Sequence, residues 1–442
     1  MSDPKFPRRR FLAVSGAAAA GLGLAGTGCG AAAKTAAPPP APLRQRVRTW
    51  QGVRGEFALV SPPTHFDTFL LSSHPRSVRA AIDGYRRGLD LSPHVYLNRR
   101  QAEIEMHVLD SAAAYLGCAR EQLALTDSTT MGIGLVYGGM RLRPGDEVVT
   151  TVHDFYATHE ALRLHSLHTP TRVRRIRLYE DPERASVDGI IRAIRDGITS
   201  STRVLALTWV HSSSGVKLPI ARIAELLRSI NKGRAKRVLL FVDGVHGLGN
   251  QPDALPRLGC DVFASGCHKW LFGPRGTGIV WVNDAGAEVL EAVIPTFDGR
   301  GYLAWLEGRP PTDLPKAAAL TPGGFHSFEH RWALAEAFQF HQAIEKRRIA
   351  ERTAELASYL KAELAALRRV RLRTPSSTDL SAGLVCFEHS SLSAPAVVDA
   401  LAARQVIATV TPYATEYVRL GPSIINSPAD IDRAIAAISA IA

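Results

Sequence analysis

The sequence predicts an α/β protein, with a large domain around a mostly parallel sheet and a smaller α+β domain at the C-terminal end. Two observations lead to this prediction. The strand-like segments between residues 147 and 282 are continuous apolar runs, clearest in VLALTWV and RVLLFVD, rather than alternating patterns. Such runs are typical of parallel strands covered by helices on both faces. Segments with helical periodicity separate them, which indicates successive strand–helix units.

The elements of the large domain can be placed in order along the chain from their apolar periodicity. Helices are expected at about 75–88, 102–116, 130–140, from about 156, and at 187–197 and 219–230. Strands are expected at 147–151, 173–178, 204–209, 238–243, 262–265 and 278–282.

The C-terminal part has a different pattern. A long helical stretch runs from Phe328 to about Leu367, and short strands follow within GLVCFEH, VIATV and YVRLG. Helices are expected at about 394–403 and 428–441. We therefore assign residues 46–325 to an N-terminal segment and the large domain, and residues 326–442 to the long helix and the small domain.

Residues 1–45 have the layout of a signal peptide and linker. Three arginines precede an apolar run from Phe11 to Gly28, and a proline-rich spacer, AAPPPAP, follows. The pair Arg8–Arg9 before Phe11 and Leu12 resembles the twin-arginine export signal. We expect a periplasmic or other extracytoplasmic location, with no transmembrane span after signal removal. Cys29 is a candidate lipidation site, although the residues before it match a lipidation motif poorly.

Composition argues against two other classes of partner. The net charge of +12 comes from 53 basic and 41 acidic residues, but the excess is diffuse and no nucleic-acid-binding motif accompanies it. We therefore expect no nucleic acid. The five cysteines are widely spaced, and the histidines between 153 and 168 do not share one helical face, so no metal site is predicted.

Polar residues at the ends of predicted strands are the candidates for chemistry, because ligands of parallel sheets bind at the carboxyl edge. Asp243 ends one strand, Ser212 follows another, and Lys269 follows a third. A lysine can form a Schiff base with an aldehyde, and a carboxylate can keep a heterocyclic nitrogen protonated. Ser128 and Thr129 open a helical segment, whose N-terminus suits a phosphate group. Taken singly, each residue has a commoner structural role as a cap, a turn or a surface side chain.

Four segments together resemble a known family. DGVHGLG, SGCHKWLFGPRGTG, TPGGFHSFEHRWAL and RLGPSIINSPADID occur in order and resemble the class V aminotransferases. These are pyridoxal phosphate enzymes of fold type I, and they include isopenicillin N epimerase-like proteins and cysteine desulfurases. The resemblance covers about residues 65–440. It implies pyridoxal 5'-phosphate as cofactor, an amino acid or amine as substrate, and a homodimer with shared active sites.

The resemblance also implies roles for individual residues. Lys269 matches the lysine that binds the cofactor covalently and then moves the α-proton of the substrate. Asp243 matches the partner of the pyridine nitrogen, and His246 lies at the position beside the phenolic oxygen. Arg419 matches the arginine that clamps the substrate carboxylate, a task that suits its bidentate geometry.

The remaining matches concern the phosphate and the ring. Ser128, Thr129 and His268 match phosphate contacts, and His153 matches the residue stacked on the ring, with Phe155 as the alternative. Thr321 and Gly323 match a loop that reaches the phosphate of the neighbouring subunit's cofactor.

Three departures from the family pattern bear on activity. LGPSIINSP follows Arg419 without a cysteine, so desulfuration through a persulfide is not expected. Gly266 stands where a phosphate-binding serine is common, and FLLSSHPRSV replaces an Asn-x-Gly pattern. We expect aminotransferase-type activity first, with epimerisation or C–S lysis as the alternative. A non-catalytic descendant and a basic surface-binding protein are the other hypotheses.

Overall fold

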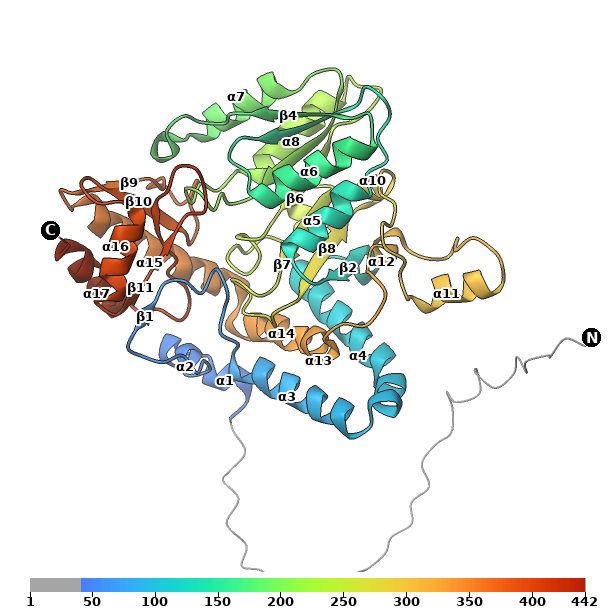
Figure 1. The fold of residues 1–442 in the computed structure, drawn as a ribbon, viewed down its shortest axis with the longest axis horizontal. Coiled ribbons are helices and arrows are strands. Elements are labelled where there is room, and N and C mark those ends of the chain that lie inside the picture. Colours follow the sequence, from blue (N-terminus) through green and yellow to red (C-terminus); the bar gives the residue numbers. More distant parts are fainter. Residues whose placement is uncertain (1–40, 442) are drawn as a thin grey trace, which may run out of the picture. The chain divides into compact units, whose positions relative to one another are not determined.

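The computed structural model describes residues 41–441 (Figure 1). The predicted signal segment up to residue 40, with Arg8, Arg9 and Cys29, lies outside the described residues. Residues 42–441 belong to one compact unit. Its first helix, α1 (Leu43–Arg46), begins inside the stretch predicted as linker, and Leu43 packs against a buried apolar cluster.

The large sheet has seven strands, and its inner strands are parallel. The pairs β4–β3, β3–β5, β5–β6 and β6–β7 are parallel, whereas β8 is antiparallel to both of its neighbours, β7 and β2. The prediction of a mostly parallel sheet is therefore confirmed. In spatial order the strands are β2 (Leu123–Thr126), β8 (Gly278–Val282), β7 (Val262–Gly266), β6 (Leu239–Asp243), β5 (Thr202–Thr208), β3 (Glu147–Thr151) and β4 (Arg172–Ile176).

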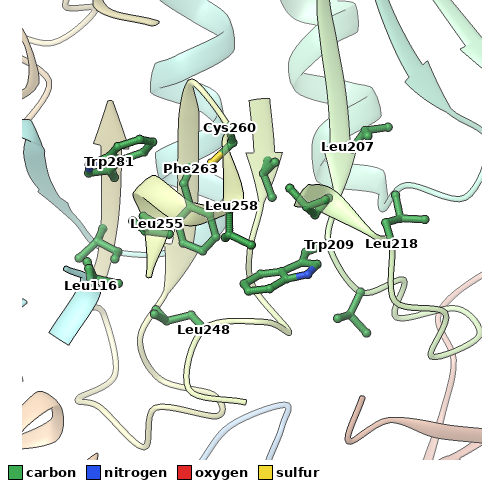
Figure 2. Close-up of a cluster of buried hydrophobic side chains, with 14 of the residues drawn as sticks. Leu116, Leu207, Trp209, Leu218, Leu248, Leu255, Leu258, Cys260, Phe263 and Trp281 are labelled. Atoms are coloured by element: carbon green, nitrogen blue, oxygen red, sulfur yellow. The ribbon is translucent and has the colours of Figure 1, made fainter. Parts of the chain in front are cut away.

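Alternate residues of the buried strands face two separate apolar cores. In β5, Val204 and Ala206 pack with helices α5 (Thr129–Gly138) and α6 (Tyr156–His168). Leu205 and Leu207 pack on the other face, in the cluster that Figure 2 shows around Trp209, Phe263 and Trp281. Because both faces are covered, every strand position can be apolar, which explains the continuous runs.

The other helices of the large layer pack against one of the two cores. Helix α10 (Asp284–Ala287) belongs to the first core and the rest belong to the second. The helices of the second core are α3 (Arg76–Leu91), α4 (Pro93–Leu116), α7 (Val187–Gly197), α8 (Ile220–Asn231) and α9 (Leu255–Leu258). Helix α7 begins at an N-cap, Ser186, whose hydroxyl accepts the amide of Gly189. Shorter turns of 3-10 helix are η1 (Arg120–Gln122) and η2 (Pro182–Arg184).

The C-terminal layer is built on a four-stranded antiparallel sheet in the order β12 (Thr409–Val410), β13 (Val418–Leu420), β10 (Val385–His389), β9 (Val370–Leu372). Helices α15 (Lys346–Ala365), α16 (Ala394–Ala402) and α17 (Pro428–Ser439) pack on it. Strand β1 (Thr64–His65) pairs with β11 (Val406–Ile407), so an N-terminal segment joins this layer. The boundary at residue 325 stays a prediction.

The structure differs from the sequence prediction at several elements. The stretch predicted as one long helix consists of α13 (Phe328–Trp332), α14 (Leu334–Ile344) and α15, and Glu345 adopts a φ of 83° at the second break. Strand β2 was not predicted, because its four residues carry too little pattern. The short helices α9 and α10 were also missed, as were α2 (Trp50–Arg54), α11 (Gly299–Leu306) and α12 (Lys316–Ala319). No helix in residues 41–441 combines the length and apolarity needed to cross a membrane.

Candidate active site

Asp243 and Lys269 lie at and just beyond the carboxyl ends of two neighbouring parallel strands. Asp243 is the last residue of β6, and Lys269 follows the end of β7. Burial lowers the pKa of Lys269 to about 8; the Asp243 carboxylate opposes this shift and the Arg419 guanidinium adds to it. Burial raises the pKa of Asp243 to about 6, against the effects of the Val245 amide and Lys269. The pair offers an amine that loses its proton easily and a buried carboxylate.

His246 is buried in the turn after β6 as a neutral imidazole. Burial places its pKa well below the usual value, and the charges of Lys269 and Arg419 lower it further. Its Nδ1 accepts the indole N–H of Trp270 at 3.1 Å. The ring of Phe69 lies edge-on to His246 and flat against Trp270, with centroid distances of 6.1 and 6.0 Å.

The N-terminus of α5 and the loop after β7 form a polar cradle. Ser128 caps α5, and the hydroxyl of Thr129 accepts the amide of Gly266 at 2.6 Å. A Cβ at Gly266 would lie 3.1 Å from that hydroxyl and 3.0 Å from the His268 ring. The Nδ1 atom of His268 is buried and has no hydrogen-bond partner in the part of the chain that the structure describes. Helix N-terminus, hydroxyls and imidazole together suit an anion.

Arg419 is a buried cation without a carboxylate partner. It lies on β13 and is 3% exposed, yet no described residue forms an ion pair with it. Its Nη1 donates to the carbonyl of Ser212 at 3.0 Å, and its Nε donates to Thr409 Oγ1 at 3.1 Å. The guanidinium also lies 4.7 Å from the centre of the Phe69 ring. A buried charge of this kind is costly unless an anion meets it.

Phe155 and His153, the two candidates for the ring above the cofactor, make different contacts. Phe155 makes an edge contact with Tyr413, whose hydroxyl bonds to Ser212 Oγ at 2.7 Å. The ring of His153 instead stacks on Tyr179 at 3.9 Å, and its Nε2 accepts the amide of Leu178. Which of the two rings covers a bound heterocycle stays a prediction.

Thr321 and Gly323 are not brought to the cradle of their own chain. The hydroxyl of Thr321 accepts the amide of Leu125 in β2, and the amide of Gly323 donates to the carbonyl of Pro295. Their predicted role concerns a neighbouring subunit, and it stays a prediction.

A buried polar group behind the site was missed by the sequence analysis. Asp154 follows β3 and accepts hydrogen bonds from Thr150, Thr151 and the amide of Thr208. Burial alone would raise its pKa, but His211 and these donors lower it. Burial in turn lowers the pKa of His211 to about 4, against the effect of Asp154. Asp154 lies three residues beyond the end of β3, near the same edge of the sheet as Asp243, and that position was the available signal.

These residues fit the cofactor predicted from sequence. The amine of Lys269 suits its aldehyde, the buried carboxylate of Asp243 suits a cationic ring nitrogen, and the cradle with the unpartnered His268 Nδ1 suits its phosphate. Arg419 is not needed for any of these three cofactor groups and is available to an anionic group of a substrate. The fold and this set define a class of enzymes that act on amino groups with an aldehyde cofactor.

Comparison with known proteins leads to the same class of enzyme. Residues 73–414 match the family described as aminotransferase class-V, and the chain belongs to this family. The family is pyridoxal phosphate-dependent, so the predicted fold class, the enzyme class and the cofactor are confirmed.

Relatives in the family differ in activity. The chain is 27% identical to isopenicillin N epimerase of Streptomyces clavuligerus over 77% of this chain and 84% of the relative. It is 25% identical to a probable cysteine desulfurase of Xylella fastidiosa over 58% and 60% of the two chains. Among solved structures, a C-DES variant with glycine covalently linked to its PLP cofactor has a TM-score of 0.78 at 18% identity, covering 87% of this chain and 98% of that one. The cysteine desulfurase CsdA of Escherichia coli has a TM-score of 0.73 at 20% identity, covering 89% and 98%.

Proposed function

We propose that the protein moves the α-proton of an amino acid whose carboxylate binds Arg419, and that the reaction is an epimerisation. The observation that carries this proposal is the buried guanidinium of Arg419, without a carboxylate partner among the described residues and close enough to Lys269 to lower its pKa. An amino acid bound there would place its carboxylate on Arg419 and its α-carbon toward the lysine. Pyridoxal phosphate, when bound, supplies the electron sink that acidifies the α-proton.

Lys269 is the group we assign to the proton on one face of the α-carbon. With its pKa near 8, roughly a fifth to a quarter of the free amine is unprotonated at pH 7.5, against about one part in a thousand at the usual value. A general base works best when its pKa lies near the operating pH. The half-buried side chain also limits the access of water to the proton in transit.

Inversion needs a second proton carrier, and we assign this role to Tyr413. Its hydroxyl bonds to Ser212 Oγ, and the carbonyl of Ser212 holds Arg419. Burial raises the pKa of Tyr413, while Ser212 and Arg419 act in the opposite direction, so the phenol is protonated at neutral pH and able to donate. Its contact with Phe155 places it beside one of the two candidates for the ring that covers the cofactor.

The relatives support epimerisation over desulfuration. Two isopenicillin N epimerases, at 27% and 26% identity, each align over 84% of their length, whereas the desulfurase alignment covers 60%. Transamination is the second candidate, because it needs the same clamp and the same lysine and is the activity in the family's name. C–S lysis would require a leaving group on the substrate's β-carbon, and no residue of the site specifies one.

Desulfuration through a cysteine persulfide has no support from the described cysteines. Burial raises the pKa of Cys118 to about 11 and of Cys386 to about 12, and it also raises the pKa values of Cys260 and Cys267. A persulfide-forming cysteine acts as a thiolate, which burial disfavours at all four positions.

The test is proton exchange with inversion. The loaded protein is incubated with single L- and D-amino acids in D₂O, with and without an α-keto acid, and the α-proton signal and the enantiomer ratio are followed. Deuteration of the α-carbon together with inversion, in the absence of the α-keto acid, supports epimerisation. Turnover that occurs only with the α-keto acid would show that the protein is a transaminase. Tyr413→Phe should keep exchange and lose inversion, and Lys269→Ala should lose both. If no amino acid exchanges its α-proton, the proposal is wrong.

We also propose that the protein is a homodimer. Large apolar side chains are exposed on and near the α11 segment, which lies on an extension beyond the large sheet in Figure 1. Phe297, Tyr302, Trp305, Leu306 and Phe325 are 57–86% exposed. A cluster of this kind is typical of an interface. Light scattering should give a dimer for the natural chain and a monomer for Trp305→Glu; a monomeric natural chain would refute the proposal.

Export by the twin-arginine route is the last proposal, and it rests on the sequence of residues 1–45. A reporter fused to this segment should reach the extracytoplasmic side, and Arg8→Lys with Arg9→Lys should hold it in the cytoplasm. Labelling with a radioactive fatty acid, compared with Cys29→Ser, tests lipid attachment at Cys29.

A further inference from the structure

We infer that Trp270 is a positioning residue that fixes the proton of His246 on Nε2, so that this imidazole can only donate a hydrogen bond to the cofactor ring. The inference rests on the cofactor assigned above and concerns two residues of this chain. An indole nitrogen donates and never accepts. Because Trp270 Nε1 lies 3.1 Å from His246 Nδ1, that ring nitrogen must be the unprotonated acceptor.

The remaining nitrogen of His246 is then the only place for its single ring proton. Nε2 has no hydrogen-bond partner among residues 41–441, although the side chain is buried. Neither a carboxylate nor a carbonyl of the described chain accepts from it. The donor is left for a ligand, and the family places the phenolic oxygen of the cofactor at this position.

The surrounding residues hold the indole in its donating geometry. Phe69 lies flat against Trp270, with an angle of 22° between the rings. On another side the chain approaches closely at Gly383, where a Cβ would lie 2.4 Å from the indole ring. Neither contact requires a nitrogen in the indole, so removing the N–H alone should leave the packing in place.

The same construction explains why His246 stays neutral in a site with two cations. The charges of Lys269 and Arg419 both oppose protonation of His246. A charged imidazolium would also carry a proton on Nδ1, and that nitrogen already accepts the N–H of Trp270. A donor that is fixed before binding does not have to select its tautomer when the cofactor arrives, and pre-organisation of this kind favours affinity.

The direct test uses the cofactor-free protein, so that it does not depend on any activity. Long-range proton–nitrogen correlation spectra distinguish a protonated from an unprotonated imidazole nitrogen, and His246→Gln identifies the resonances of His246. The natural chain should show Nδ1 unprotonated and Nε2 protonated. Trp270→Phe keeps an aromatic ring against Phe69 and should shift His246 toward a mixture of tautomers. A protonated Nδ1 in the natural chain, or an unchanged tautomer in Trp270→Phe, would overturn the inference.

A double-mutant cycle separates positioning from packing. Loss of one hydrogen bond predicts that Trp270→Phe weakens binding of pyridoxal phosphate about 2- to 10-fold. In a His246→Gln background the same change should have little effect, because an amide donates without a tautomer choice. An equal loss in both backgrounds would mean that Trp270 acts only by packing, and the inference would fall. Failure of both proteins to bind the cofactor at all would instead refute the cofactor assignment.

Discussion

Replacement of Arg419 by lysine is the most informative single change, because it keeps the positive charge and removes the planar guanidinium with its paired N–H donors. The guanidinium has five N–H donors. Two of them are used, by Thr409 Oγ1 and by the carbonyl of Ser212. The other three have no partner among the described residues and can meet a carboxylate with two parallel hydrogen bonds.

A lysine at position 419 would keep at most one of these bonds at comparable geometry. The loss of one hydrogen bond to a charged group costs about 1.5–3 kcal/mol. That cost predicts roughly a 10- to 150-fold fall in kcat/KM for an amino acid substrate. The corresponding amine, which lacks the carboxylate, should change little.

The assay measures α-proton exchange for a matched amino acid and amine, in the natural chain and in Arg419→Lys. Arg371→Lys is the control, because Arg371 is an exposed arginine of the same layer, paired with Glu183. An equal loss for the amino acid and the amine would refute the clamp, since it would show that the change disturbs the lysine or the cofactor instead.

Three further predictions follow from burial and close packing. The rate of covalent attachment of pyridoxal phosphate to Lys269 should increase as the pH rises through about 8, the pKa of this lysine. Asp243→Asn removes the charge that raises the pKa of Lys269, so it should move the midpoint of the pH profile lower. A midpoint near the usual lysine value in the natural chain would contradict this prediction. Gly421→Ala should lower the free energy of unfolding by about 1–3 kcal/mol and disturb Phe69, because the new Cβ would lie 2.1 Å from that ring. Gly84→Ala in helix α3 has open space around it and should raise the free energy of unfolding by up to about 1 kcal/mol. Urea unfolding of both variants measures the two changes. Burial and the charge of Lys346 lower the pKa of His341 to about 3, so the unfolded state binds more protons as pH falls below about 6.5. This group should then lower the free energy of unfolding by about 1.4 kcal/mol for each unit that the pH falls, and the fall should be less steep in His341→Gln, as urea unfolding at several pH values would measure.

The parts of the site that could be predicted from sequence are those fixed by local geometry. A residue at the end of a buried parallel strand must lie at the carboxyl edge, so Asp243 and Lys269 could be expected to meet. The orientation of a loop side chain depends instead on distant partners. His153 is turned toward Tyr179 and Leu178, some 25 residues away, and nothing in TTVHDFYAT indicates this. The helix break at Glu345 could not be predicted, because no glycine or proline stands there. The hydrogen bond between Trp270 and His246 depends on how two loops pack, which the sequence pattern does not indicate.

Arg419 shows why the site needs both layers of the protein. The guanidinium lies on β13 of the C-terminal sheet, but one of its two internal hydrogen bonds goes to Ser212, which follows β5 of the large sheet. Tyr413, on the loop between β12 and β13, bonds to the same serine. A small displacement of one layer against the other would therefore move the clamp and the proposed second proton carrier together, while Lys269 and the phosphate cradle stayed with the large sheet. Binding of a substrate carboxylate to Arg419 would offset the cost of burying its charge, and it would do so fully only when the layers are packed as they are here. We therefore expect substrate binding to stabilise the packing between the layers. Hydrogen exchange in β12–β13 should slow with a bound amino acid and stay unchanged with the matched amine.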